Sequence, residues 1–330
     1  MGVQLTASER DAVTRYRELI PGESPFPLFF QPWWLDAVCD LGQWRVVVRE
    51  NGGKLTAAMP YRLTRRLGMN FITMPPLTQF LGPWVAPLPG KYATRLGREK
   101  GLIGELIESI PEFDYFNVNL SSEVSNWLPF YWRGFTQTTY YSYVLDDLVG
   151  EQRVWSGMED KLRSEIRKGQ KSITVRDDGV VAELEVMLEA TYSRQGLPLP
   201  IPREVLRQVW EACQRRRCGR IYIAEDKEGG LCAGALIVWD SDCAYYLVGG
   251  SDPQARRTGA GSVVVWEAIR AAREHARRFD FEGSMVEPIE RFFRSFGAVQ
   301  RPYSNIRKIT PRAAALVGAR RRWLRLRKRI

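Results

Sequence analysis

The feature that most constrains the fold is a run of three strand-like segments in the second half of the chain. Apolar and polar residues alternate in the first segment, and residues 227–230, with two adjacent glycines, form the turn that follows it. Short alternating segments separated by such turns predict an antiparallel three-stranded meander. The three segments are residues 220–226, 231–240 and 243–250.

A helix and further strands are expected after this meander. Residues 262–278 carry apolar side chains at helical spacing, which predicts an amphipathic helix. Strands are expected at residues 278–283 and 299–309. Between them, we expect a helix at residues 288–296 that ends before Gly297, because glycine is common just beyond a helix.

The first half of the chain repeats part of this order. Residues 51–53, Asn-Gly-Gly, are a hairpin turn between strands expected at residues 44–50 and 55–62. A helix is expected at residues 102–110 and a strand at residues 113–120. The run FDYFN followed by FYWRGF in this half parallels FDFEG followed by FFRSFG in the second. This weak duplication favours two copies of one fold.

Length and composition agree with two globular domains. At roughly 100–200 residues per domain, 330 residues favour about two domains. Hydrophobic residues make up 45% of the chain and charged residues 26%, which excludes a largely disordered protein. We expect an N-terminal domain at residues 1–145 without a phosphate loop, a C-terminal domain at residues 146–312 with one, and a basic tail at residues 313–330.

Histidine and cysteine usage excludes several kinds of chemistry. The chain has one histidine, His275, so metal sites built on two histidines are excluded and no metal is expected. A Ser-His-Asp triad through His275 is formally available, but no nucleophile elbow accompanies it. His275 lies in a charged helical segment and is interpreted as a solvated surface residue. Five scattered cysteines argue against a disulfide framework and favour a reducing compartment.

Positive charge is concentrated at the C-terminal end. The net charge is +10, and residues 320–330 hold seven positive charges. Such a segment indicates binding to phosphate, either of a nucleic acid or of an anionic membrane, and Trp323 with Leu324 would suit an interfacial helix. A solvated terminal helix is the alternative. No transmembrane segment or secretory signal is recognised, so we expect a cytoplasmic protein, with peripheral association at the inner membrane face through residues 320–330 as a further option.

A glycine-rich loop is expected between the meander and the helix that follows it. Its sequence fits the pattern R-x-x-G-x-G. Glycines let the main chain approach a phosphate group, and amides at a helix N-terminus face its charge. A glycine turn flanked by solvated arginines is the alternative. The candidate donor phosphate-binding residues are Arg256, Arg257, Gly259, Ala260 and Gly261.

This order of strands, loop and helices resembles the GNAT acyltransferases, whose loop holds the pyrophosphate of coenzyme A. Two such halves in one chain look like the FemABX group, which transfers amino acids from aminoacyl-tRNA to peptidoglycan precursors. The resemblance covers roughly residues 25–310. It implies an α/β (α+β) fold of two tandem GNAT-like domains, each with a mixed, largely antiparallel sheet flanked by helices.

A basic segment at the start of the second half supports the FemABX resemblance. Residues 162–168, LRSEIRK, are similar to a basic helix of that group. Arg163 and Arg167 lie four residues apart, on one helical face, and together with Lys168 are candidates for binding an acceptor or a diphosphate. A solvated basic helix is the alternative.

Two departures from the resembled families put the donor in doubt. Phe293 stands where many GNAT enzymes carry a tyrosine acid and where FemABX proteins often carry a lysine. Arg294 follows it directly. The long helical arm of some FemABX proteins is also absent. We expect Phe293, Arg294 and Tyr192 to line the cleft.

Two carboxylates are candidates for catalysis. Asp280 and Glu282 alternate with phenylalanines, so both are expected on one face of a strand that borders the cleft. A half-buried carboxyl beside another has a raised pKa and becomes a usable base, for which we favour Glu282. Neutralisation of the pair by Arg291 or Arg294 is the alternative. Tyr303 is a candidate acid, although tyrosines in such strands are more often packed.

These features favour an N-acyltransferase that forms an amide on an amine acceptor. The donor is expected to be aminoacyl-tRNA, with acyl-CoA as the alternative, and no tightly bound cofactor is expected. The acceptor is a cell-wall precursor or a small amine metabolite. A catalytically degenerate GNAT-like binding protein is a second alternative, favoured by Phe293. A nucleic-acid-binding module without catalysis is the third, and the nearly neutral body counts against it.

Overall fold

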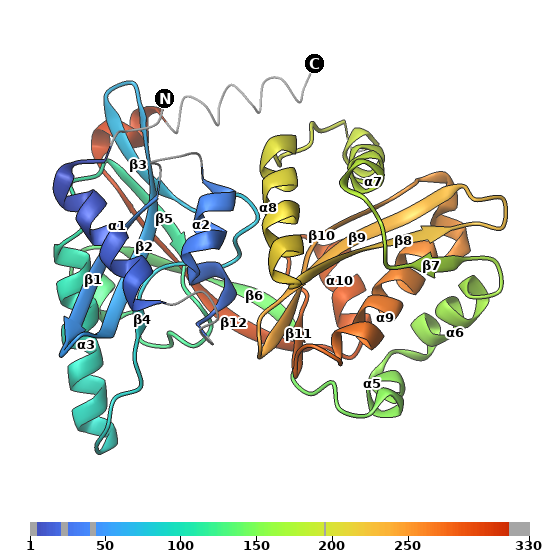
Figure 1. Cartoon of the computed structure of the whole chain (residues 1–330), viewed down its shortest axis with the longest axis horizontal. Helices are drawn as coiled ribbons and strands as arrows, with labels where there is room; N and C mark the ends of the chain where they lie inside the picture. Colours follow the sequence, from blue (N-terminus) through green and yellow to red (C-terminus); the bar gives the residue numbers. More distant parts are fainter. Residues whose placement is uncertain (1–4, 21–25, 40–43, 195, 317–330) are drawn as a thin grey trace. The chain divides into compact units, whose positions relative to one another are not determined.

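A computed structural model describes residues 5–20, 26–39, 44–194 and 196–316. The chain divides into two compact units, which are described separately (Figure 1). The first unit comprises Met1–Thr139 and Tyr303–Ile330, and the second comprises Tyr140–Pro302.

The sheet of the first unit is a meander extended by two further strands. Neighbouring strands run antiparallel, except that β3 and β5 run parallel. The sheet order is β1 (Trp44–Asn51), β2 (Lys54–Arg66), β3 (Met69–Thr73), β5 (Tyr115–Asn119) and β12 (Val299–Ile309), with β4 (Trp84–Val85) beside β2. The helices are α1 (Ala7–Leu19), η1 (Leu28–Phe30), α2 (Pro32–Val38), α3 (Tyr92–Glu108) and α4 (Leu128–Tyr131).

Local sequence explains the hairpin and the core of this unit. Gly52 and Gly53 both adopt positive φ, which the tight turn between β1 and β2 requires. Pro32 occupies the first position of α2, where a missing N–H costs nothing. The largest fully buried side chains of the unit include Tyr16, Phe29, Trp34, Phe116 and Phe130.

The second unit has the same kind of sheet. β10 and β11 run parallel, and the other neighbouring pairs run antiparallel. The sheet order is β6 (Thr136–Leu145), β11 (Arg278–Asp280), β10 (Cys243–Ser251), β9 (Leu231–Trp239), β8 (Gly219–Glu225) and β7 (Thr174–Arg176). The helices are α5 (Glu151–Gly157), α6 (Asp160–Gly169), α7 (Val181–Ser193), α8 (Arg203–Arg216), η2 (Gln254–Thr258), α9 (Ala260–Ala272) and α10 (Glu287–Ser295).

Apart from β4 in the first unit and β7 in the second, the two units share one strand order: three antiparallel strands, a fourth strand parallel to the third, and a fifth strand antiparallel to the fourth. The fifth strand comes from the other half of the sequence in each case. β6 follows β5 along the chain but pairs with β11, whereas β12 follows β11 and pairs with β5. The expected α/β fold of two domains, each with a mixed, largely antiparallel sheet flanked by helices, is confirmed.

Several boundaries differ from those expected from the sequence. β11 ends at Asp280 rather than at residue 283, because the main-chain amide of Glu282 donates to Asp280 Oδ1 (2.7 Å) and Glu282 turns away at φ 58°. α9 ends at Ala272, six residues earlier than expected. Residues 303–309 group with the first unit because β12 pairs there with β5.

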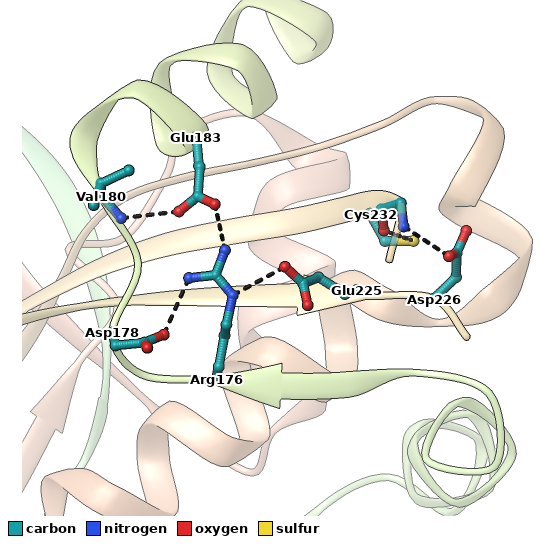
Figure 2. Close-up of polar contacts among 8 residues, drawn as sticks. Arg176, Asp178, Val180, Glu183, Glu225, Asp226 and Cys232 are labelled. Carbon is teal, nitrogen blue, oxygen red and sulfur yellow. Dashed lines mark hydrogen bonds and ion pairs between the residues drawn. The ribbon is translucent and has the colours of Figure 1, made fainter. Parts of the chain in front are cut away.

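An arginine joins β7 to β8 and to the start of α7. Figure 2 shows the Arg176 guanidinium among the carboxylates of Asp178, Glu183 and Glu225. The carboxylate of Glu183 also accepts the main-chain N–H of Val180 at 3.0 Å, which caps α7. The network fixes where α7 begins, and α7 packs against β9 and β10 on its way to Tyr192.

Candidate active site in the second unit

The site lies where the two parallel strands of the second unit stop pairing. β11 pairs with β10 only along residues Cys243 to Tyr245, while β10 continues to Ser251. A bulge between Tyr246 and Val248 bends β10 at this point. The two strands therefore separate beyond Tyr245. The residues that follow each of them, the η2 loop on one side and Glu282 on the other, are the candidates for chemistry.

Glu282 has an unusual environment for a carboxyl group. Its Oε1 atom has no exposed surface and no hydrogen-bond partner among the residues that the structure describes, although the residue as a whole is partly exposed. Burial, and secondarily the nearby charge of Asp280, raises the pKa of Glu282 well above its usual value. A buried polar atom without a partner is rare in a folded protein and is often functional.

The backbone around Glu282 is tightly constrained. Glu282 adopts a positive φ, which is strained for a residue with a side chain. Gly283 follows at φ 68°, and a Cβ atom there would overlap the main-chain carbonyl of Tyr141 on β6. Asp280 is buried and accepts hydrogen bonds from the Glu282 amide and from the hydroxyl of Ser142. The neighbouring strand thus holds both carboxyl groups in place.

The arginines expected as partners of these carboxyl groups bind other acids. Arg294 forms ion pairs with Glu290 and Glu159, each at 3.1 Å, and Arg291 pairs with Glu287 at 3.1 Å. The alternative in which Arg291 or Arg294 neutralises Asp280 and Glu282 is therefore wrong.

Phe293 is part of an aromatic cluster. Its buried ring lies 5.0 Å from that of Phe281 and 5.7 Å from that of Tyr246. Burial, with a contribution from Tyr192, raises the pKa of Tyr246, and burial also raises the pKa of Tyr192. Tyr192, at the end of α7, thus lies close enough to Tyr246 to affect its ionisation, and both phenols are neutral at physiological pH.

The glycine-rich loop has one covered side and one open side. Gly259 precedes α9 at φ 77°, and a Cβ atom there would lie 3.0 Å from Cγ of Glu165. A Cβ atom at Gly261 would have nothing within 4 Å. Arg256 and Arg257 are exposed and form no ion pair with any residue in the described ranges, while the Ala260 amide donates to Thr258 Oγ1 at 3.2 Å. The loop thus has two exposed arginines, Arg256 and Arg257, and open space beside Gly261.

The basic residues of α6 lie on two faces. Arg163 forms an ion pair with Asp160 and also donates to the Ser156 carbonyl at 3.5 Å. The Arg167 guanidinium lies 5.3 Å from the ring centroid of Trp155 on α5, a cation–π contact. Lys168 is exposed. The two arginines therefore face α5, and diphosphate binding by Arg163, Arg167 and Lys168 stays a prediction.

Two further candidates are not part of the described second unit. Tyr303 belongs to the first unit, where its ring lies 6.0 Å from that of Phe80, so its role as an acid stays a prediction. Residues 320–330, the predicted polyanion-binding segment, lie outside the described residues.

Sequence reasoning misjudged His275 and missed three polar residues. His275 is stacked on Trp239, with ring centroids 4.3 Å apart, so the expectation of a solvated helix residue was wrong. Burial, followed by the charge of Arg220, lowers its pKa. Ser142, Glu165 and Ser262 contact the site through hydrogen bonds between residues about a hundred or more positions apart. No local sequence signal marks such partners.

The described part of the chain contains no cluster of three or more His, Cys, Asp or Glu side chains arranged to hold a metal ion. Within the same ranges, no helix has the length and apolar character needed to cross a membrane.

Comparison with known proteins identifies the fold. Residues 156–292 match the family model of the acetyltransferase (GNAT) domain. FemX is similar over 92% of this chain and 96% of its own, with a TM-score of 0.63 and 12% identity. L-PGS from Bacillus licheniformis is similar over 96% of this chain and 95% of its own (TM-score 0.52, 10% identity). A tandem GNAT protein from the clavulanic acid biosynthesis pathway matches over 92% and 96% (TM-score 0.51, 12% identity). A search of curated protein sequences found no match.

Proposed function

We propose that this chain, in which residues 156–292 form a GNAT domain, is an N-acyltransferase that forms an amide on an amine acceptor. The observation that carries the proposal is the buried, unpartnered Oε1 atom of Glu282 where β10 and β11 separate. A carboxyl group with a raised pKa suits proton transfer near neutral pH, which is what an ammonium acceptor requires.

The proposed mechanism uses groups of the second unit. Glu282 takes a proton from the acceptor ammonium, and the free amine attacks the acyl carbonyl of the donor. The new C–N bond forms, the ester or thioester bond breaks, and the proton that the attacking nitrogen loses passes to the departing oxygen or sulfur. Main-chain amides at the bulge of β10, near Leu247, are suited to stabilise the oxyanion. Asp280 positions Glu282 through its hydrogen bond to the Glu282 amide.

We favour aminoacyl-tRNA as the donor. The seven positive charges in residues 320–330 suit a polyanion, and Arg256 and Arg257 are free of ion pairs in the described part of the chain. A tRNA donor places the activity in the cytoplasm, with a cell-wall precursor or a small amine metabolite as acceptor. Truncation before residue 320 should flatten the salt dependence of tRNA binding. If it instead abolishes co-sedimentation with anionic liposomes, the segment binds the membrane face.

Acyl-CoA is the second candidate donor, and the glycine loop before α9 is the observation that favours it. Incubation with a pool of charged tRNAs or of acyl-CoA thioesters, each with amine acceptors, separates the two by mass spectrometry of the products. The proposal expects an amide product with the wild-type chain and much less with Glu282→Gln. A folded wild-type chain that gives no product from either pool would refute it and favour a binding protein.

A further inference from the structure

The covered side of the glycine loop is occupied by an acidic side chain. Oε1 of Glu165, on α6, accepts a hydrogen bond from the hydroxyl of Ser262 at 2.7 Å. Ser262 is buried in the first turn of α9, and Glu165 also lies against Gly259. The carboxylate therefore sits at the start of α9, where the helix dipole favours negative charge.

The main chain of α6 lies close to the glycine loop at Glu165 and again at Gly169. Four residues along α6, a Cβ atom at Gly169 would lie 2.6 Å from Val263 Cγ2 and 2.9 Å from the Thr258 carbonyl oxygen. The main-chain oxygen of Glu165 would likewise be 3.2 Å from a Cβ atom at Gly259. The main chain of α6 is thus in close contact with the loop. Rotation of the Glu165 side chain away from the loop would break the bond to Ser262.

The position of this charge bears on which donors the loop can accept. A diphosphate that approached the start of α9 would place its negative charges beside the carboxylate of Glu165, and like charges repel. Glu165 is an exposed residue, so the repulsion is largest at low ionic strength. The open side, with Gly261 and the free Arg256 and Arg257, still has room and positive charge for a single phosphate group.

We propose that Glu165 excludes diphosphate-bearing donors, such as coenzyme A thioesters, from the loop and leaves it open to the singly charged phosphodiesters of an RNA 3′ end. The inference rests on the proposed function, in which this loop meets the donor. It assigns donor selectivity to one side chain, and the residue acts by repulsion without touching the reacting atoms.

The test is calorimetric binding of coenzyme A to the full chain and to Glu165→Gln and Glu165→Ala. Glu165→Gln keeps an acceptor for Ser262 and removes the charge, so it should bind coenzyme A at least tenfold more tightly than the wild type. Glu211→Gln is the matched control, since it makes the same charge change on the exposed face of α8. It should change the affinity by less than twofold.

Two further ligands test whether the effect of Glu165 depends on the diphosphate. Pantetheine lacks the diphosphate, so its binding should not respond to Glu165→Gln. An aminoacylated RNA minihelix should bind wild type and variant within threefold of each other. If the folded Glu165→Gln and Glu165→Ala variants both bind coenzyme A no more tightly than the wild type, the role of Glu165 is refuted.

The outcome is distinguishable from failure of the proposed function. A gain in coenzyme A affinity without amide formation from any donor would refute the transferase and keep the role of Glu165. If the wild type forms an amide but Glu165→Gln leaves the affinity for coenzyme A unchanged, the transferase is supported and the role of Glu165 is refuted.

Discussion

The fourth strands of the two units carry polar residues at matching positions but use them differently. Asn117 on β5 and Asp280 on β11 are each the last residue paired with the third strand of their unit. In the first unit, the side-chain amide of Asn305 donates to Asn117 and Asn119, both at 2.8 Å. In the second unit, Glu282 stands at the position of Asn119 and leaves Oε1 unpartnered among the described residues. The first unit uses these positions for side-chain hydrogen bonds, whereas the second unit places there the carboxyl group that we propose as the base.

The connection between the third and fourth strands differs as well. In the first unit, residues 74–91 contain five prolines and border a pocket of about 450 Å³ whose lining includes Trp84, Leu88 and Leu96. In the second unit, the shorter connection holds η2 and the open Gly261. From this comparison we propose that donor binding and catalysis belong to the second unit, and four predictions test the proposal.

The largest effect is expected from Glu282→Gln. It keeps the size of the side chain and removes the base, so kcat/KM for amide formation should fall by about 10²-fold or more. Asn119→Ser, at the matching position of the first unit, should leave kcat/KM within twofold while lowering the melting temperature, because Asn305 loses an acceptor. Equal losses of activity in the two variants would break the comparison.

A smaller effect, roughly tenfold on kcat/KM, is expected from Asp280→Asn. The asparagine oxygen can still accept from Ser142 and from the Glu282 amide, but the charge that helps to raise the pKa of Glu282 is gone, which weakens the base. The matched change is Asn117→Asp in the first unit, for which steady-state kinetics should show an unchanged rate.

A several-fold rise in KM for the donor, with little change in kcat, is expected from Gly261→Val. A Cβ atom there meets no protein atom within 4 Å, so we expect the fold to tolerate the change and the ligand to be obstructed. Gly101→Val introduces the same side chain into open space on α3 of the first unit. Donor titrations that cannot distinguish the two variants would remove the loop from the site.

The smallest effect concerns stability against pH. The pKa of Glu282 is raised in the folded chain, so the unfolded chain releases this proton first, and folding stability falls as pH rises from about 4.5, the ordinary value. Glu282→Gln has no such loss. Thermal unfolding between pH 4 and pH 8 should show a melting temperature for the variant that gains on the wild type as pH rises. A constant difference would contradict the raised pKa.

Local patterns predicted the fold, and contacts distant in sequence determined the site. Alternation over residues 220–250 and the glycine turn at residues 51–53 depend on near neighbours, so strands and hairpin were found. The pairing of β6 with β11 and of β12 with β5 depends on segments more than a hundred residues apart. This pairing brings Ser142 to Asp280 and Asn305 to Asn117 and Asn119. The same holds for Glu165.

The carboxyl pair illustrates where pattern reasoning stops. Strand alternation put Asp280 and Glu282 on one face, whereas the chain leaves the strand at Asp280 and turns at Glu282. This turn depends on two contacts: the Asp280 side chain accepts the main-chain amide of Glu282, and Gly283 passes close to β6. The alternation of apolar and polar residues predicts neither contact.

The most direct test of catalysis by the second unit is the pH dependence of kcat/KM with one donor and one acceptor. For the wild type, we expect an acidic limb with an apparent pKa clearly above 4.5, because Glu282 must lose its proton before it can act as a base. In Asp280→Asn the limb should move to lower pH, and in Glu282→Gln it should disappear along with most of the activity. A limb that keeps its position in Asp280→Asn and persists in Glu282→Gln would show that another group is the base.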